Sequence, residues 1–234
     1  MTYLYFVSIF FIFILIIGIY LHNRKIYIDS SYYKITKHPY WQLWYNKGIS
    51  GEYSIYKALS FLENQGAKFL FNLYIPTYNN KTTEIDVVMI ASEGIFVFES
   101  KNYSGWIFGT EGQKKWTQTL PSGYGNSTKE HFYNPIMQNE NHIKYLKKLL
   151  NDNIKYFSII VFSDKCEFKN IKVKINSESI LIHKYKLNNT VKNIMANSKA
   201  VLSNDIISQI YNKLLPYSQV DETIKKQHIA NIKN

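Results

Sequence analysis

The chain has 234 residues and a formal net charge of +11, with 46% apolar and 19% charged residues. This length suits one domain with appendages, and the lack of a repeat with a period of about 20–50 residues excludes a solenoid. The apolar fraction excludes an intrinsically disordered chain.

The first predicted element is an apolar helix over residues 3–21, which contain no charge. Its length of about 28 Å matches the hydrocarbon core of a bilayer. A cleaved signal peptide is the alternative, but no basic residue precedes the segment and no small-residue cleavage motif follows it. Arg24 and Lys25 come directly after it, which places the remainder of the chain in the cytoplasm. We expect residues 1–22 to be the anchor of a single-pass cell-membrane protein.

Residues 23–46 are predicted to connect this anchor to a folded domain. The connector contains four aromatic residues that suit the interface between membrane and water, namely Tyr40, Trp41, Trp44 and Tyr45.

The domain is predicted to begin with an amphipathic helix that ends near Gln65, with Ser50 as its N-cap and Gly66 as its stop. Its buried stripe consists of Ile55, Ala58, Leu59 and Leu62. Glu52 lies three residues before Ile55 and therefore shares this stripe.

Strands are expected next at residues 68–75, 84–91 and 94–101, followed by further short strands between residues 105 and 116. Residues 121–133 have the composition of a mobile loop.

A second helix is predicted from Asn134-Pro135, with Asn134 as its N-cap, to about Leu150, and a strand at residues 156–162 follows. The order of helix, three strands, helix and strand predicts an α/β (α+β) fold with a central mixed sheet flanked by helices.

A C-terminal extension is expected over residues 166–234. It would contain an edge strand at 171–175, an apolar run at 180–183, a helix over 191–215 and a polar, frayed tail from Pro216.

Two neighbouring strands carry the candidate catalytic residues. A hairpin loop at Ser92-Glu93 sets Asp86 opposite Glu99, whereas a loop at Glu93-Gly94 sets Asp86 opposite Lys101. Because side chains alternate along a strand, both registers bring these three residues to one patch of the sheet.

Two carboxylates at cross-strand distance repel each other, by a few tenths to about 1 kcal/mol even when exposed. A divalent cation would offset the repulsion between Asp86 and Glu99, and their hard oxygen atoms suit Mg²⁺ or Mn²⁺. Lys101 could add positive charge beside an attacking water or a phosphate. The alternative is an ion-pair network on a half-exposed sheet.

The charge is distributed unevenly along the chain. Residues 51–100 contain three lysines and six acids, net −3, whereas residues 101–200 contain sixteen lysines and seven acids, net +9. A carboxylate site would therefore lie in a positive field that attracts a polyanion, unless these lysines are ordinary solvated surface. The candidate phosphate contacts are Lys114, Lys115, Lys144, Lys147 and Lys148.

Asp86 and the later Glu99-Ser100-Lys101 resemble the D…(D/E)-x-K signature of the PD-(D/E)XK nuclease superfamily, whose restriction-endonuclease-like core has the same order of elements. Five blocks over residues 47–165 resemble more specifically the nuclease-related domain, NERD. These blocks are Gly51-Glu52, Glu84-Ile85-Asp86, Glu99 to Gly105, Trp116, and Asn134 to Gln138.

The resemblance implies that Asp86 and Glu99 are ligands of Mg²⁺ (or Mn²⁺), with the backbone carbonyl of Ser100 as a third candidate. It also implies that Lys101 positions or activates water.

Two further roles follow from the same resemblance. Glu52 would be an accessory acid that reaches the metal through water, and Gln138 would orient groups in the site from the second helix.

The sequence therefore predicts a membrane-anchored, metal-dependent nuclease that hydrolyses phosphodiester bonds of nucleic acid, with DNA favoured over RNA. The alternative is a non-catalytic membrane scaffold that binds nucleic acid or a protein through a nuclease-like fold, since a fold does not by itself specify a function. Binding that depends on salt but not on metal would favour the scaffold.

Overall fold

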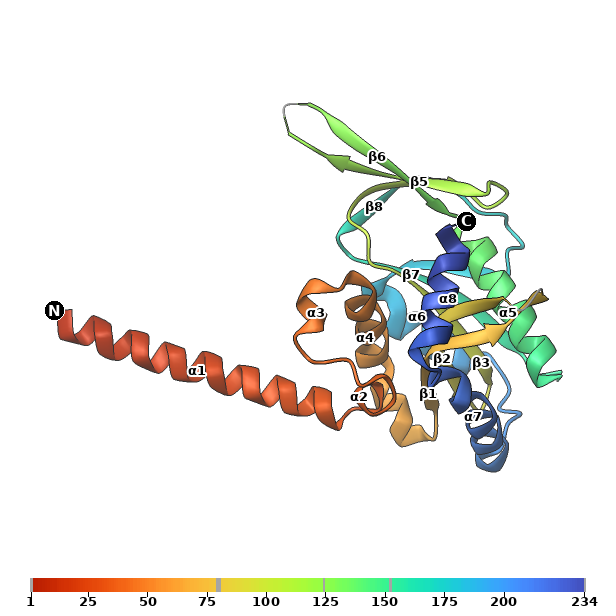
Figure 1. Ribbon diagram of the computed structural model, residues 1–234, viewed down its shortest axis with the longest axis horizontal. Coiled ribbons are helices and arrows are strands. Elements are labelled where there is room, and N and C mark those ends of the chain that lie inside the picture. The colour runs from red at the N-terminus through yellow and green to blue at the C-terminus, as the bar shows by residue number, and fades with distance from the viewer. Residues whose placement is uncertain (1, 79–80, 124, 152, 234) are drawn as a thin grey trace.

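The computed structural model describes residues 2–78, 81–123, 125–151 and 153–233. A five-stranded mixed sheet forms its centre, with the strand order β1-β2-β3-β7-β9 (Figure 1). Its strands are β1 (Lys68–Pro76), β2 (Thr82–Ala91), β3 (Gly94–Lys101), β7 (Tyr156–Phe162) and β9 (Ser179–His183). The first three strands are antiparallel, and β3, β7 and β9 are parallel. The predicted α/β class with a central mixed sheet is confirmed.

Helices cover both faces of this sheet. The helix α4 (Lys47–Leu59) packs on the face that carries Phe96 and Phe98. The helices α5 (Pro135–Leu150) and α7 (Asn204–Ser218) pack on the opposite face, which carries Val88 and Val97. Because side chains alternate along β3, Glu99 and Lys101 lie on the same face as Val97 and are directed toward α5.

The helix α4 begins earlier than predicted. Asn46 is its N-cap, since the Asn46 side chain accepts a hydrogen bond from the backbone N–H of Ile49 at 3.1 Å. Ser50 therefore lies within the first turn and not before it. A short 3-10 helix, η1 (Ser60–Gln65), continues α4, and Gly66 ends it in the left-handed conformation with φ 91°, as predicted.

A second sheet has the strand order β6-β5-β4-β8. Its strands are β4 (Gly105–Thr110), β5 (Lys115–Pro121), β6 (Ser127–Tyr133) and β8 (Cys166–Lys172). The hairpin of β5 and β6 projects from the body of the molecule (Figure 1), and Trp116 at its base is buried against Phe132 and Phe162.

The prediction of a mobile loop at residues 121–133 is wrong for residues 127–133, which form β6. The strand β6 pairs antiparallel with β5, from Tyr133 opposite Lys115 to Ser127 opposite Pro121. Only Phe132 of β6 packs inward among otherwise exposed residues, so the strand shows no apolar alternation by which the sequence could have predicted it.

The C-terminal extension also differs from its prediction. The expected single helix is two helices, α6 (Leu187–Ala196) and α7. The edge strand β8 begins at Cys166 and ends at Lys172, so it overlaps the predicted strand at 171–175 only at residues 171–172. The polar tail contains a helix, α8 (Glu222–Lys233), in which His228 is buried against β2. A small 3-10 helix, η3 (Lys184–Lys186), precedes α6.

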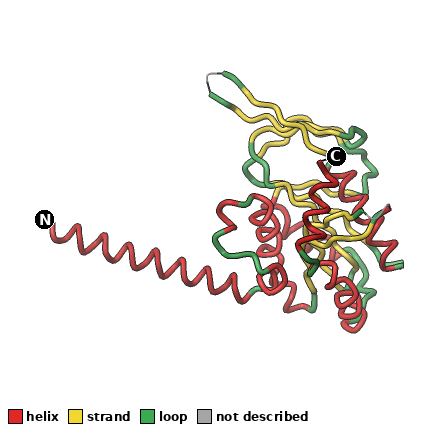
Figure 2. The backbone as a smooth tube through the Cα atoms, in the orientation of Figure 1, coloured by secondary structure: helices red, strands yellow, loops and turns green. Residues whose placement is uncertain are grey.

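The N-terminal helix α1 (Thr2–Asp29) extends away from the body (Figures 1 and 2). It is long and apolar enough to span a membrane, and none of its most apolar window is buried. The short helices α2 (Ser31–Thr36) and α3 (Gln42–Tyr45) follow it. The predicted connector contributes to the core, because Tyr27 and Tyr32 are fully buried.

We predict that Asn46→Ala lowers the free energy of unfolding by about 1 kcal/mol, because it removes the N-cap of α4. Ser50→Ala is the matched control and is expected to change the free energy of unfolding by less than about 0.5 kcal/mol. Denaturant titration of the full chain in detergent micelles measures both values. Equal losses in the two variants would contradict the assignment of Asn46 as the cap.

Candidate active site

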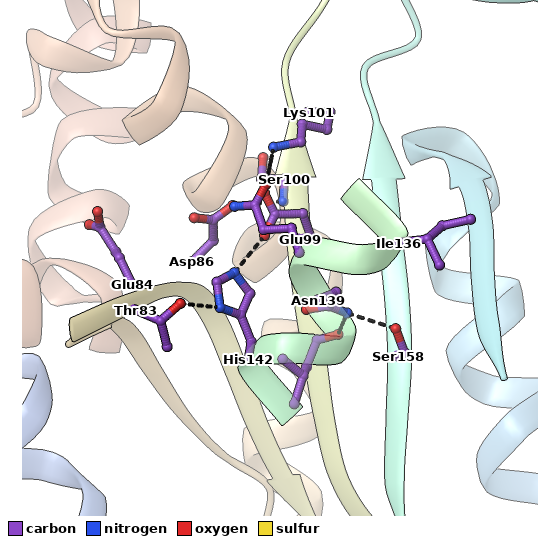
Figure 3. Close-up of polar contacts among 12 residues, drawn as sticks. Thr83, Glu84, Asp86, Glu99, Ser100, Lys101, Ile136, Asn139, His142 and Ser158 are labelled. Atoms are coloured by element: carbon purple, nitrogen blue, oxygen red, sulfur yellow. Dashed lines mark hydrogen bonds and ion pairs between the residues drawn. The ribbon is translucent and has the colours of Figure 1, made fainter. Parts of the chain in front are cut away.

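The candidate site lies where β2 and β3 are crossed by the first turns of α5 (Figure 3). The hairpin loop is Ser92-Glu93, since β2 and β3 pair from Ala91 opposite Gly94 to Val87 opposite Phe98. The next position in this register sets Asp86 opposite Glu99, which is the first of the two predicted alignments.

The Asp86 carboxylate is oriented by the neighbouring strand. Its Oδ2 accepts a hydrogen bond from the backbone N–H of Ser100 at 2.8 Å. Burial, followed by the negative charges of Glu99 and Glu52, raises the pKa of Asp86 well above its usual range. An added positive charge would therefore stabilise the ionised carboxylate.

The Glu99 side chain is 1% exposed and is held from two sides. Lys101 Nζ donates to Glu99 Oε1 at 2.6 Å, and His142 Nε2 lies 3.1 Å from Glu99 Oε2. Burial alone would raise the pKa of Glu99, but Lys101 and His142 outweigh it and lower the pKa. Glu99 is therefore held as a carboxylate.

The Lys101 ammonium also connects Glu99 to α5, because it donates a second hydrogen bond to Gln138 Oε1 at 3.1 Å. Burial alone would lower the pKa of Lys101, but the carboxylates of Glu99 and Asp86 raise it. The structure thus brings Asp86, Glu99, Lys101 and Gln138 together, as the sequence led us to expect.

His142 is a site residue that the sequence analysis missed. It is 3% exposed and lies between Glu99 and Thr83 (Figure 3). Because an ionised carboxylate only accepts, Nε2 donates to Glu99, and Nδ1 can accept from Thr83 Oγ1 at 2.8 Å. Its position one turn after Gln138 on the same helix face was the available signal.

Asn139 fixes α5 to the sheet beneath the site. Its buried Nδ2 donates to the backbone carbonyl of Val97 and to Ser158 Oγ, both at 2.9 Å. These two bonds join α5 to β3 and β7, so the positions of Gln138 and His142 relative to Glu99 are set by the sheet.

A cavity of about 340 Å³ opens beside Asp86. Its lining comes from β2, the end of β6, α5 and α8, and consists of Thr82, Thr83, Glu84, Asp86, Tyr133, Gln138, His142 and His228. Tyr133 and His228 come from the segments that were predicted as loop and tail. The cavity reaches Asp86 and Glu84, whereas Glu99 is not among the residues that line it.

Glu52 lies on α4 and is buried, as its position in the apolar stripe predicted. The hydroxyl of Tyr32 donates to Glu52 Oε2 at 2.9 Å. Burial is the main cause that raises the pKa of Glu52 to about 7, and the charges of Glu84 and Glu99 add to it. Glu52 lines a separate cavity of about 580 Å³, which shares Glu84 with the cavity beside Asp86.

Gly51 explains why α4 can approach β3 so closely. A Cβ atom at this position would overlap the Oγ of Ser100. The Gly51-Glu52 pair therefore combines close packing on Ser100 with a buried acid beside it.

The five lysines that we predicted to contact phosphate lie at two separate places. Lys114 and Lys115 are exposed at the start of β5, beside the N-terminus of α5, because the Lys114 carbonyl accepts from the Asn134 N–H. The other three are exposed on the C-terminal half of α5, with their Nζ atoms over tyrosine rings. They are Lys144, Lys147 and Lys148.

The residues present fit a cation that takes few protein ligands. Within the described part of the chain, no three His, Cys, Asp or Glu side chains converge as a metal cluster. Mg²⁺ commonly uses one or two carboxylates and completes its octahedron with water and substrate phosphate. Asp86 and Glu99 supply two such carboxylates, and the pKa of Asp86 is raised by burial and then by the negative charges of Glu99 and Glu52, which a cation would offset.

A mixed sheet that presents Asp86 beside Glu99-x-Lys101, with helices on both faces, defines a nuclease-like protein of the PD-(D/E)XK superfamily. The model of the nuclease-related domain (NERD) matches residues 47–163. An uncharacterized protein of Bacillus anthracis is 33% identical over 201 residues, which cover 86% of this chain and 88% of that protein. The chain belongs to the NERD family. No solved structure matches it.

The raised pKa of Glu52 predicts how pH changes stability without metal. The pKa of Glu52 is about 7 in the folded protein and 4.5 in a model peptide, so the folded state binds the proton more tightly than the unfolded state. The free energy of unfolding therefore falls as the pH rises from 4.5 to 7. In EDTA, Glu52→Gln should raise the free energy of unfolding at pH 8 by about 1–3 kcal/mol and change it little at pH 4.

The control for this measurement is Glu167→Gln, since Glu167 is exposed on β8. Denaturant titrations at the two pH values compare both variants with the wild type. A Glu52→Gln effect that is equal at pH 4 and pH 8 would contradict a titration of Glu52.

Proposed function

We propose that the protein is a metal-dependent nuclease that hydrolyses phosphodiester bonds of nucleic acid. The observation that carries this proposal is the cluster of half-buried Asp86, buried Glu99 and half-buried Lys101, with an open cavity beside Asp86. A purely structural ion pair would need one acid for one base. Here the carboxylates of Asp86 and Glu99 lie on adjacent strands, and burial, followed by the negative charges of Glu99 and Glu52, raises the pKa of Asp86.

Asp86 and Glu99 would hold Mg²⁺ or Mn²⁺, with the backbone carbonyl of Ser100 as a further candidate ligand. When bound, the cation would polarise the scissile phosphate and lower the pKa of water. Within the chain itself, the backbone N–H of Ser100 orients Asp86, and His142 orients Glu99.

Lys101 would position the attacking water and stabilise negative charge that develops on the phosphate. Gln138 on α5 accepts a hydrogen bond from the ammonium at 3.1 Å and so helps to hold its position. Glu52 would act as an accessory acid from the other face of the sheet, with Tyr32 holding its carboxyl.

The substrate would approach along exposed lysines, and we favour DNA over RNA. Lys114 and Lys115 lie beside the N-terminus of α5 and would contact phosphates near the scissile bond. The three lysines on α5 begin six residues after Gln138, about 9 Å along the helix, and would contact phosphates farther away.

We propose further that α1 anchors the protein in the cell membrane with the nuclease domain in the cytoplasm. Arg24 and Lys25, exposed just after the apolar segment, support this orientation. The burial of Tyr27 in the core supports an anchor over a cleaved signal peptide, since cleavage near residue 22 would cut a helix that is continuous with the domain.

Asp86→Ala and Lys101→Ala should each reduce cleavage at least 100-fold, because each removes a group proposed to act on the reacting phosphate or its metal. The assay uses the full chain in detergent, with single- and double-stranded DNA and RNA and with Mg²⁺, Mn²⁺ or EDTA. Lys199→Ala, which changes an exposed lysine away from the site, is the control.

Cleavage by Asp86→Ala or Lys101→Ala at the wild-type rate would overturn the proposal. If the wild type binds nucleic acid in a salt-sensitive way, cleaves none of these substrates, and binds equally well without metal and as Glu99→Gln, the protein is a scaffold.

His142→Gln should reduce cleavage about 10- to 100-fold, because it removes the group that orients Glu99. Exposed His131 on β6 provides the matched control, His131→Gln. Because His142 acts through Glu99, higher concentrations of metal should restore part of the lost activity. Full activity of His142→Gln at limiting metal would contradict this role.

A further inference from the structure

The helix α1 does not stop where its apolar segment ends. It continues without interruption to Asp29, and Tyr27 near its end is fully buried. The hydroxyl of Tyr27 donates to the backbone carbonyl of His38 at 2.8 Å. Its ring contacts four others, with centroid distances of 4.9–6.1 Å, namely Tyr32, Tyr33, Tyr40 and Tyr53.

This continuity leaves no flexible linker between the apolar segment and the domain. Leu21 and Tyr27 are six residues apart, which is about 9 Å along a helix. The headgroup layer on one side of a bilayer is about 5–8 Å thick. If α1 spans a membrane, the surface of the domain around Tyr27 must therefore lie against the headgroups.

An aromatic platform occupies this surface, and we define it as Tyr40, Trp41, Trp44 and Tyr45. The exposed fractions of Trp41, Trp44 and Tyr45 are 53%, 57% and 80%. Leu43, between them, packs on the core instead. The segment thus directs one apolar residue inward and three large aromatic rings outward.

The platform is continuous with α1. The ring of Tyr20, at the end of the apolar segment, stacks on Trp44 at 5.9 Å and contacts Tyr40 at 5.7 Å. Tyrosine and tryptophan favour the headgroup level of a bilayer, where the ring is in apolar surroundings and the polar atom remains hydrated.

Exposed basic residues lie on both sides of the platform in the sequence. Arg24 and Lys25 are on α1, and Lys37 and Lys47 lie just before and just after the platform. Anionic phospholipids attract such residues, by about 1 kcal/mol for each side chain near the surface. A phospholipid surface is the partner that matches both the aromatic rings and the positive charge.

We propose that the aromatic platform is a second membrane contact, which lies in the phospholipid headgroup layer beside α1 and fixes the orientation of the domain on the bilayer. The proposal rests on the proposed anchoring by α1. It assigns a function to residues that lie outside the segment matched by the NERD model.

The four tryptophans of the chain allow a direct test. Trp41 and Trp44 belong to the platform, whereas Trp106 and Trp116 belong to the second sheet. The full chain is reconstituted in nanodiscs of phosphatidylcholine and phosphatidylglycerol, with or without lipids that carry a spin label near the headgroup. We expect the spin label to quench the tryptophan fluorescence of the wild type. The quenching in the double variant Trp41→Phe/Trp44→Phe should be at least fivefold weaker.

Trp106→Phe is the matched control and should be quenched at least as strongly as the wild type. Equal quenching of Trp41→Phe/Trp44→Phe and the wild type would overturn the platform, as would a wild type that is not quenched. Phenylalanine preserves the apolar ring, and circular dichroism of each variant verifies its fold.

Alkaline extraction of membranes distinguishes the two proposals. If the wild type stays in the membrane after alkaline extraction but its tryptophans are not quenched, the anchor proposal stands and the platform proposal fails. If alkali releases the wild type from the membrane, both proposals fail.

Discussion

The burial of Glu99 is the constraint on which the site depends. A carboxylate that is 1% exposed is stable only when its charge is met by partners, and removing one partner of a buried pair costs several kcal/mol. Lys101 from β3 supplies a positive charge, and His142 from α5 donates a hydrogen bond. The strand and the helix must therefore keep their relative position, which Asn139 secures from beneath.

The end of the apolar helix α1 and the candidate site are joined by one aromatic core. The ring of Tyr32 contacts Tyr27 of α1 at 6.1 Å, and its hydroxyl donates to Glu52 on α4. Gly51, the neighbour of Glu52, lets α4 approach Ser100, whose N–H orients Asp86. A continuous set of contacts thus leads from the end of the apolar helix to the face of the sheet that carries the candidate site.

The hairpin of β2 and β3 was predictable because its alternation and its loop are local properties of the sequence. The same holds for the N-terminus of α5, where Asn134 caps the helix and Pro135 begins it. Other assignments depended on distant parts of the chain and failed. The strand β6 is held by its backbone pairing with β5, and α8 by the contact of His228 with Thr82, 146 residues earlier. Neither contact leaves a periodic pattern.

The sequence by itself determined the order of the core elements α4, β1, β2, β3, α5 and β7, the apolar helix, the family, and the set of Asp86, Glu99, Lys101 and Gln138. These follow from spacing and composition within short segments. Only the tertiary structure decided that His142 completes the support of Glu99 and that Tyr133 and His228 line the cavity. It also decided that the predicted connector is part of the core. The physical reason is that a side chain acquires its neighbours only when separate elements pack together, and one residue's position along the chain does not specify them.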